Sequence, residues 1–231
     1  MGADGWEAVA LSLKVAAVAT LFGAPLALVV AMVQARARSG LRLLLDVLVT
    51  LPLVLPPVAT GYGLLVLFGR HGLIGAGLSK LGVVFAFDWT GAALAAGIMG
   101  FPLMVRPMRL AIEALDPELI AVAKTLGAPA SARFLRLTLP LAAPGIAAGA
   151  ILGFAKALGE FGATITFVAA IPGRTLTLPA AIYGATQSPG GDARALALCL
   201  VATALAVGAM VVSDVVGRWA ARISRGPVAG I

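Results

Sequence analysis

The chain alternates long apolar runs with short polar segments, and this pattern predicts a bundle of membrane-spanning helices. About 20 helical residues, with a range of roughly 17 to 25, cross the hydrocarbon core of a bilayer. The predicted spans are residues 8–33, 43–68, 89–105, 141–168 and 195–216. A sixth run at 176–185 is too short to span and predicts an interfacial or re-entrant helix.

Composition supports an all-α, polytopic membrane bundle. Hydrophobic residues form 61% of the 231 residues, and charged residues form only 12%. A soluble domain of this size could not bury so much apolar surface. The formal net charge of +7 would suit nucleic acid as a partner. However, the basic residues lie at the ends of apolar runs and not along one soluble face, so we expect no nucleic-acid partner.

The distribution of lysine and arginine predicts the orientation of the bundle. Eleven of these residues follow the first, third and fifth spans, whereas four lie on the opposite side. Because basic residues accumulate on the cytoplasmic side, we expect the N-terminus outside and the C-terminus inside. The cytoplasmic group is Arg36, Arg38, Arg42, Arg106, Arg109, Lys124, Arg133, Arg136, Arg218, Arg222 and Arg225. The first span opens with Asp4 and Glu7 instead of basic residues, so it is expected to be retained and not cleaved as a signal peptide.

Two spans carry residues that disturb or tighten helix packing. Prolines in the sequence Leu-Pro-Leu-Val-Leu-Pro-Pro at 51–57 predict that the second span is bent or broken. This break is either a structural kink or the wall of a passage. In the fourth span, Gly145, Gly149 and Gly153 recur every four residues, which lets two helices approach closely in lipid. This packing seam lies either inside the subunit or between two copies.

The polar segment around residues 106–140 contains a short amphipathic helix. The sequence Asp-Pro-Glu at 116–118 predicts its start, with an Asp cap and proline at the first helical position. Gly127 predicts its left-handed stop. Apolar residues recur at i, i+3, i+4 and i+7, namely Leu119, Val122, Ala123 and Leu126. A helix of about ten residues is marginal alone in water, so its apolar face must pack either on the chain's own membrane helices or on another protein.

This polar segment resembles the cytoplasmic "EAA" loop of ABC-importer permeases, in which the short helix docks in a groove of the ATPase subunit. The match comprises Ala-Val-Ala-Lys-Thr-Leu-Gly at 121–127 and Leu-Thr-Leu-Pro at 137–140. The chain departs from that family at Ala121, where glutamate is usual. Glu118 lies one turn earlier on the same face and is expected to substitute. The resemblance assigns ATPase coupling to Glu118, Ala121, Val122, Ala123, Lys124, Thr125, Leu126, Gly127 and Ala128.

The rest of the chain is similar to the permeases of molybdate ABC importers. The resemblance rests on residues 51–57, 158–167, 171–173, 178–183 and 221–225. The string Gly-Glu-Phe-Gly-Ala at 159–163 is shared with sulfate and tungstate permeases, and its continuation to Phe167 favours molybdate. The resemblance implies one type I ABC-importer transmembrane domain over residues 1–231. It also implies a coupling loop at about 106–140 and an external loop with a short helix at about 169–194.

The same resemblance implies the partners. We expect a homodimer of this permease in the bacterial plasma membrane, two cytoplasmic ATPase subunits and a periplasmic molybdate-binding protein. Molybdate is the expected substrate, with sulfate, thiosulfate or tungstate as alternatives. The chain lacks a Gly-x-x-x-x-Gly-Lys-Ser/Thr phosphate loop, so ATP and Mg are expected on the partner subunits. No cofactor, metal site or catalytic residue is expected in this chain.

Lys156 and Glu160 are the charged residues deepest in the predicted membrane. At i and i+4 they are expected to share a helix face and neutralise each other. They either brace the fourth span or lie beside the anion path, and bracing is favoured because an exposed Glu160 would repel an anion. The candidates for the translocation path or gate are Pro56, Pro57, Thr60, Gly61, Lys156, Glu160, Gly162 and Thr164.

Two other classes of protein fit the sequence less well. An ion-coupled secondary carrier predicts internal inverted repeats with paired broken helices, which the sequence does not show. An intramembrane enzyme needs a nucleophile with a base or a set of redox ligands. With His71 predicted in a loop and Cys199 as the single cysteine, most such chemistries lack their parts.

Overall fold

The computed structural model describes residues 2–224, which form helices joined by turns and loops. Four helices are long and apolar enough to cross a membrane, and the bent pair α2–α3 raises the number of crossings to five if it counts as one span. The long helices are α1 (Ala3–Arg36), α2 (Ser39–Val54), α5 (Trp89–Glu113), α8 (Leu139–Leu158) and α11 (Asp192–Ser224). The shorter ones are α3 (Pro57–Phe68), α4 (Gly75–Lys80), α6 (Pro117–Thr125), α7 (Ala130–Arg133), the π-helix η1 (Phe134–Thr138), α9 (Gly162–Val168) and α10 (Leu178–Thr186).

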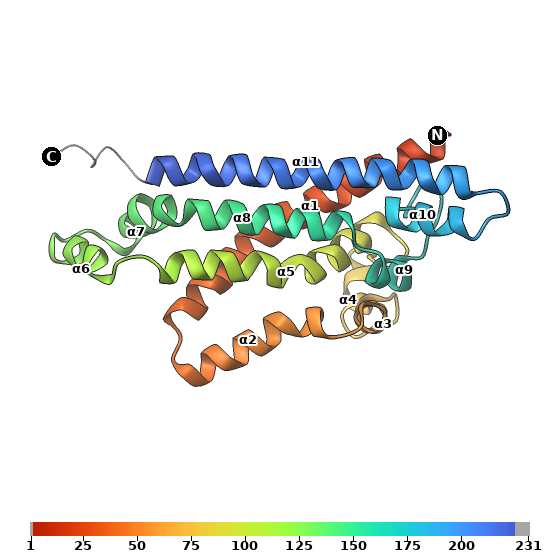
Figure 1. Cartoon of the computed structure of the whole chain (residues 1–231). Coiled ribbons are helices and arrows are strands. Elements are labelled where there is room, and N and C mark those ends of the chain that lie inside the picture. Colours follow the sequence, from red (N-terminus) through yellow and green to blue (C-terminus); the bar gives the residue numbers. More distant parts are fainter. Residues whose placement is uncertain (1, 225–231) are drawn as a thin grey trace.

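The long helices run back and forth between two ends of the molecule (Figure 1). One end carries α6, α7 and the turn between α1 and α2, and the other carries α3, α4, α9, α10 and the N-terminus. The pair α2–α3 returns the chain from the first end to the second. We call these the cytoplasmic end and the external end, following the charge distribution. Arg225, which entered that distribution, lies outside the described residues.

The second span is broken, as its prolines predict. Helix α2 ends at Val54, α3 begins at Pro57, and the two axes differ by 109°. Proline at the first position of α3 has no N–H to satisfy, so a new helix can start there at low cost. Helix α3 therefore does not continue across the membrane but turns aside at the external end.

The prediction of one continuous fourth span at 141–168 is wrong. Helix α8 ends at Leu158, a break follows at residues 159–161, and α9 is a separate helix of seven residues. Several other predicted boundaries also differ. Helix α5 continues to Glu113, so Arg106 and Arg109 lie on a helix and not in the cytoplasmic loop. Helix α1 reaches Arg36, beyond the predicted end at residue 33.

The glycine seam lies inside the subunit, between α5 and α8. A methyl group on Gly149 would lie 2.6 Å from the carbonyl oxygen of Met104, and one on Gly145 would lie 2.3 Å from the Cβ of Ala111. Gly153 faces the Met104 side chain in the same way. The two helices therefore pack almost backbone to backbone, and no larger residue fits at these positions.

Candidate functional site

Helix α6 has the start and the stop that the sequence predicts. The Asp116 side chain accepts a hydrogen bond of 2.8 Å from the Glu118 N–H, and Pro117 occupies the first turn. At the other end, the Ala128 N–H donates to the Ala123 carbonyl, while Gly127 adopts a φ of +78°. This is a Schellman ending, which glycine adopts without steric cost. The helix is therefore confirmed, and its role in coupling stays a prediction.

The apolar face of α6 is uncovered. Leu126 is 81% exposed, Val122 is 58% exposed, and no residue of this helix is buried. At the start of the helix, Leu119 and Ile120 lie with Leu137 and Leu141 around a cavity of 260 Å³. The chain's own membrane helices therefore do not cover Val122 and Leu126 of the apolar face. An exposed apolar patch on a short helix is typical of a docking site for another protein.

The segment that follows α6 connects it firmly to α8. Arg133 donates from Nη1 to the Ala128 carbonyl at 2.5 Å, which closes the turn after α6. The π-helix η1 then joins α7 to α8 without a break, and its last hydrogen bond runs from the Leu139 N–H to the Phe134 carbonyl. Pro140 lies directly after it and has no N–H to donate, which favours this irregular ladder. A turn at residues 126–129 therefore joins α6 to a helical segment that runs without a break from Ala130 into α8.

The structure brings the predicted path residues together where α3 crosses α9 at the external end. A methyl group on Gly61 would lie 2.4 Å from the Ala163 carbonyl oxygen, and one on Gly162 would lie 2.6 Å from the Cβ of Pro57. The two glycines thus allow a very close crossing. Thr164 is buried in α9, and the Thr60 hydroxyl is buried without a hydrogen-bond partner among the described residues. Pro56, the residue before α3, is exposed in this single chain.

Lys156 and Glu160 form an ion pair, although they do not share one helix as predicted. Lys156 lies in α8, Glu160 lies in the break after it, and Nζ lies 2.5 Å from Oε2. Glu160 is only 3% exposed, and its other carboxylate oxygen accepts a hydrogen bond of 3.0 Å from the Ala163 N–H at the start of α9. Both oxygens are therefore engaged within the subunit. This geometry favours bracing of the α8–α9 break over direct contact with an anion.

Replacing Lys156 by Met is expected to destabilise the permease, because the buried Glu160 carboxylate would lose its partner. Breaking a buried pair in this way costs about 3–5 kcal/mol. The double variant Lys156→Met/Glu160→Gln should recover most of the loss, since no buried charge remains. Thermal unfolding and uptake by the assembled complex would be measured for both variants. Near-normal uptake with Lys156→Met alone would remove any role of Lys156 in the path.

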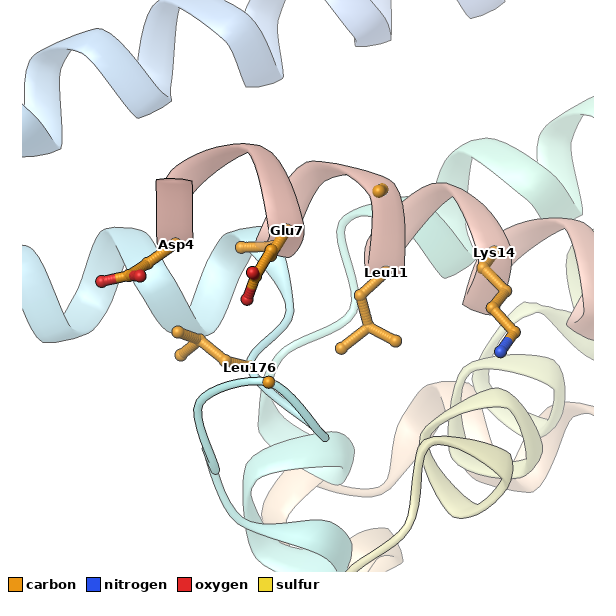
Figure 2. Close-up of a pocket in the computed structure, with 8 residues that line it drawn as sticks. Asp4, Glu7, Leu11, Lys14 and Leu176 are labelled. Carbon is orange, nitrogen blue, oxygen red and sulfur yellow. The ribbon is translucent and has the colours of Figure 1, made fainter. Parts of the chain in front are cut away.

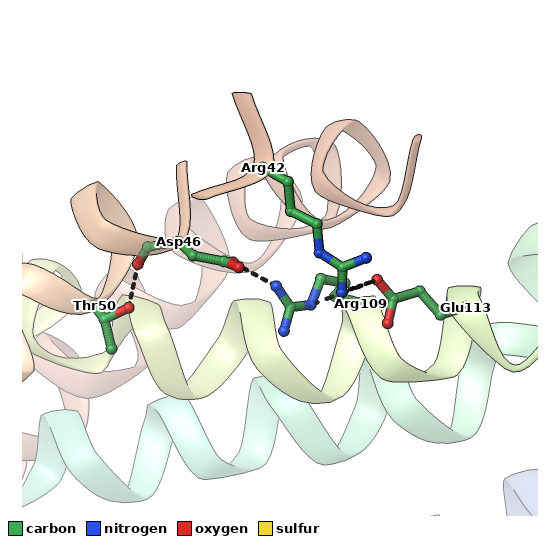
Figure 3. A network of polar contacts seen from close by, with 5 residues as sticks. All are labelled: Arg42, Asp46, Thr50, Arg109 and Glu113. Carbon is green, nitrogen blue, oxygen red and sulfur yellow. Dashed lines mark hydrogen bonds and ion pairs between the residues drawn. The ribbon is translucent and has the colours of Figure 1, made fainter. Parts of the chain in front are cut away.

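A network of charged residues ties α2 to α5 near the cytoplasmic end (Figure 3). Arg109 of α5 pairs with Asp46 of α2, and Arg42 of α2 pairs with Glu113 of α5 at 2.9 Å. Arg109 also approaches Glu113 within the same helix at 3.8 Å. Sequence reasoning missed this network. The available signal was the carboxylate of Asp46 inside an apolar run, which requires a cationic partner in a membrane.

At the external end, a cavity of 410 Å³ lies between the start of α1 and the loop before α10 (Figure 2). Its wall includes Asp4, Glu7 and Leu176. Lys14 also lines it and lies 3.6 Å from the ring centre of Trp89, in a cation–π contact. The loop itself is held firmly, since the Ser12 hydroxyl accepts a hydrogen bond of 2.6 Å from the Leu178 N–H. The cavity thus lies at the external end, beside a loop that is tied to α1.

Four or five candidate crossings in the described residues, a short helix with an uncovered apolar face at one end and a close crossing of broken helices at the other are typical of a membrane transport permease. The chain belongs to the family of binding-protein-dependent transport system inner membrane components, whose model matches residues 23–225. It is accordingly a multi-pass inner-membrane component of an ABC transporter and not its ATPase.

Individual relatives agree with this assignment. The chain is 51% identical over 221 residues to the molybdenum transport system permease protein ModB of Escherichia coli K12, and the match covers 95% of each chain. It is 45% identical over 225 residues to the protein of the same name in Haemophilus influenzae, covering 96% of this chain and 98% of that one. Among solved structures, a bacterial alginate ABC transporter in complex with its periplasmic protein matches the fold. The TM-score is 0.70 with 20% identity, over 97% of this chain and 81% of that one.

Proposed function

We propose that this chain is the permease subunit of an ATP-driven importer that carries molybdate across the bacterial plasma membrane. The observation that supports an external motor is the uncovered apolar face of α6 at the cytoplasmic end. The substrate follows from relatives named as molybdenum permeases, one of which is 51% identical over 95% of this chain. Sulfate and tungstate are the alternative substrates.

The proposed complex contains two copies of this chain, two ATPase subunits and one extracytoplasmic molybdate-binding protein. One copy leaves α2 without a single buried residue, and much of its exposed surface is apolar. A second copy placed against α2 and α3 would cover part of that surface and enclose a passage between the two subunits. The open cavity bordered by Asp4 and Glu7 supports docking of the binding protein at the external end.

The mechanism that we propose is alternating access. Molybdate is a tetrahedral dianion at neutral pH, so it cannot cross hydrocarbon without a lined path. Closure of the ATPase pair on ATP would pull the two α6 helices together. Helix α6 is joined to α5 on one side and to α8 on the other, and these two helices pack along the glycine seam. The stroke would therefore tilt both helices and separate the external crossings of α3 and α9, and hydrolysis would reverse the motion.

Reconstitution tests this function directly. The permease and its ATPase subunits are placed in proteoliposomes that contain ATP, and the binding protein with radiolabelled molybdate is added outside. We expect molybdate uptake to require both ATP and the binding protein. Excess tungstate should inhibit this uptake more strongly than excess sulfate does. Uptake of sulfate in preference to molybdate would overturn the substrate, and uptake without ATP or partner subunits would overturn the class of transporter.

Replacing Glu118 by Ala tests whether this residue substitutes for the glutamate missing at Ala121. Glu118 is exposed on α6, so the loss should leave folding intact. Loss of one exposed charged contact lowers the free energy of docking by about 1 kcal/mol. We therefore expect the ATPase activity that the binding protein stimulates to fall about fivefold. Glu118→Gln, which keeps the size and the hydrogen-bonding oxygen, should lose less. Unchanged coupling in Glu118→Ala would show that Glu118 does not replace the missing glutamate. The proposed docking of α6 would not be affected by that result.

A further inference from the structure

A small polar cavity lies between α1, α2 and α5 in the cytoplasmic half of the subunit. It has a volume of 140 Å³. Gln34 contributes from the last turn of α1, and Arg106 and Arg109 contribute from the last turns of α5. Asp46 and Thr50 complete the polar wall from α2. The cavity belongs neither to the coupling surface of α6 nor to the crossing of α3 and α9.

Two buried nitrogen atoms at this cavity have no hydrogen-bond partner among the described residues. They are Nε2 of Gln34 and Nε of Arg109, the second of which lies 3.8 Å from a carboxylate oxygen of Glu113, too far for a hydrogen bond. The Gln34 residue is only 1% exposed, so bulk water does not satisfy its amide. Both atoms are donors, and a buried donor without an acceptor is destabilising. The Gln34 amide nitrogen therefore offers the cavity a donor that no acceptor among the described residues satisfies.

The charges around the cavity leave a net excess of one cation. Arg109 pairs with Asp46, and Arg42 pairs with Glu113. Arg106 lines the same cavity and makes no ion pair with any residue in the described part of the chain. Arg106 is exposed, so solvent screens its charge, but its guanidinium can still form a charge-assisted hydrogen bond that is stronger with an anion than with water. An anion supplies both the acceptors and the charge.

We propose that this cavity is an oxyanion-binding site, which takes a small tetrahedral anion of the transported class at the cytoplasmic end of the subunit. The identity of the anion as molybdate rests on the proposed function. Its oxygens would accept from Gln34 Nε2 and Arg109 Nε, and Arg106 would balance its charge. Several oxygens of the anion can accept hydrogen bonds at once, because the donors come from two different helices. The bound anion would connect α1 to α5 beside the ion pairs that tie α5 to α2.

Equilibrium binding of radiolabelled molybdate tests this site. The complete complex of permease and ATPase subunits, purified in a maltoside detergent that contains no phosphate, is studied without the binding protein. We expect binding by the wild type that Gln34→Leu and Arg106→Gln each weaken by about tenfold, as for the loss of one charge-assisted or buried hydrogen bond. Arg70→Gln, at an exposed arginine of the external end, is the matched control and should bind like the wild type.

Folding of the variants is checked by thermal unfolding. Gln34→Leu removes an amide nitrogen that has no partner, and Arg106 is exposed, so neither should lower the stability. Equal affinity in the wild type and both site variants would overturn the proposal. A phospholipid headgroup offers similar oxygens, so binding is repeated in phospholipid nanodiscs. If molybdate binding disappears there, the cavity holds a lipid phosphate and the proposed ligand is wrong.

Uptake by the same preparations, with ATP and the binding protein, separates this inference from the proposed function. If the wild type takes up molybdate and the variants bind it unchanged, the proposed anion site is wrong and the proposed function stands. If molybdate is not taken up but its binding still depends on Gln34 and Arg106, the proposed substrate is wrong and the oxyanion site stands.

Discussion

Replacing Val122 by aspartate is expected to lower ATP-driven uptake at least about tenfold and to release the ATPase subunits from the purified complex. Val122 lies at the centre of the uncovered face of α6 and is 58% exposed. Full burial of a valine side chain on docking contributes about 1.5–3 kcal/mol, and a buried charge in its place adds a further desolvation cost. Co-purification of the ATPase, stimulated ATP hydrolysis and uptake would be measured together.

The matched control for this change is Val83→Asp, at an exposed valine of the loop between α4 and α5 at the external end. It introduces the same charge on the side of the membrane where no ATPase is expected. Val83→Asp should keep the ATPase subunits in the complex. Full retention of the ATPase and normal uptake by Val122→Asp would contradict the docking role of α6, whatever the control shows.

Replacing Gly149 by valine is expected to abolish accumulation of the folded permease in the membrane. A Cβ at this position would lie 2.6 Å from the Met104 carbonyl oxygen, so α8 would have to move away from α5 along their whole contact. Overpacking of a tight interior costs about 1–3 kcal/mol even when side chains can adjust, and here the obstacle is backbone. Membrane-fraction yield and thermal unfolding would measure the effect.

Gly208→Val in α11 is the matched control, because a Cβ at Gly208 meets no atom within 4 Å. The same residue is thereby introduced into another membrane helix without a clash. Normal yield and stability for Gly208→Val, with loss for Gly149→Val, is the expected result. Equal tolerance of both changes would show that the α5–α8 seam is not required for folding.

Helix α6 could be predicted almost residue by residue because its signals are local. The Asp116 cap, the proline at the first position and the left-handed Gly127 each act within one turn. The break in the second span was predictable for the same reason, since proline removes a donor wherever it lies. What these signals cannot tell is which partner covers an exposed face.

Features set by specific side-chain contacts were not predictable from the apolar pattern of the sequence. The break after α8 contains no proline, and the run 141–168 is apolar enough to span. The break is instead stabilised by Glu160, which bonds to Lys156 before it and to the Ala163 N–H after it. The pair of Asp46 and Arg109 joins residues 63 positions apart. No periodicity in the sequence reports such a contact.

The interlocked packing of α5 and α8 has a consequence for the amplitude of motion. In the alternating-access mechanism proposed above, two helices packed this closely would tilt together as a single rod. With 25 residues, α5 is about 37 Å long at 1.5 Å per residue. Over that length, a swing of roughly 10° displaces the far tip by about 6 Å. This leverage would turn a small stroke at the inner leaflet into a wide aperture at the outer one.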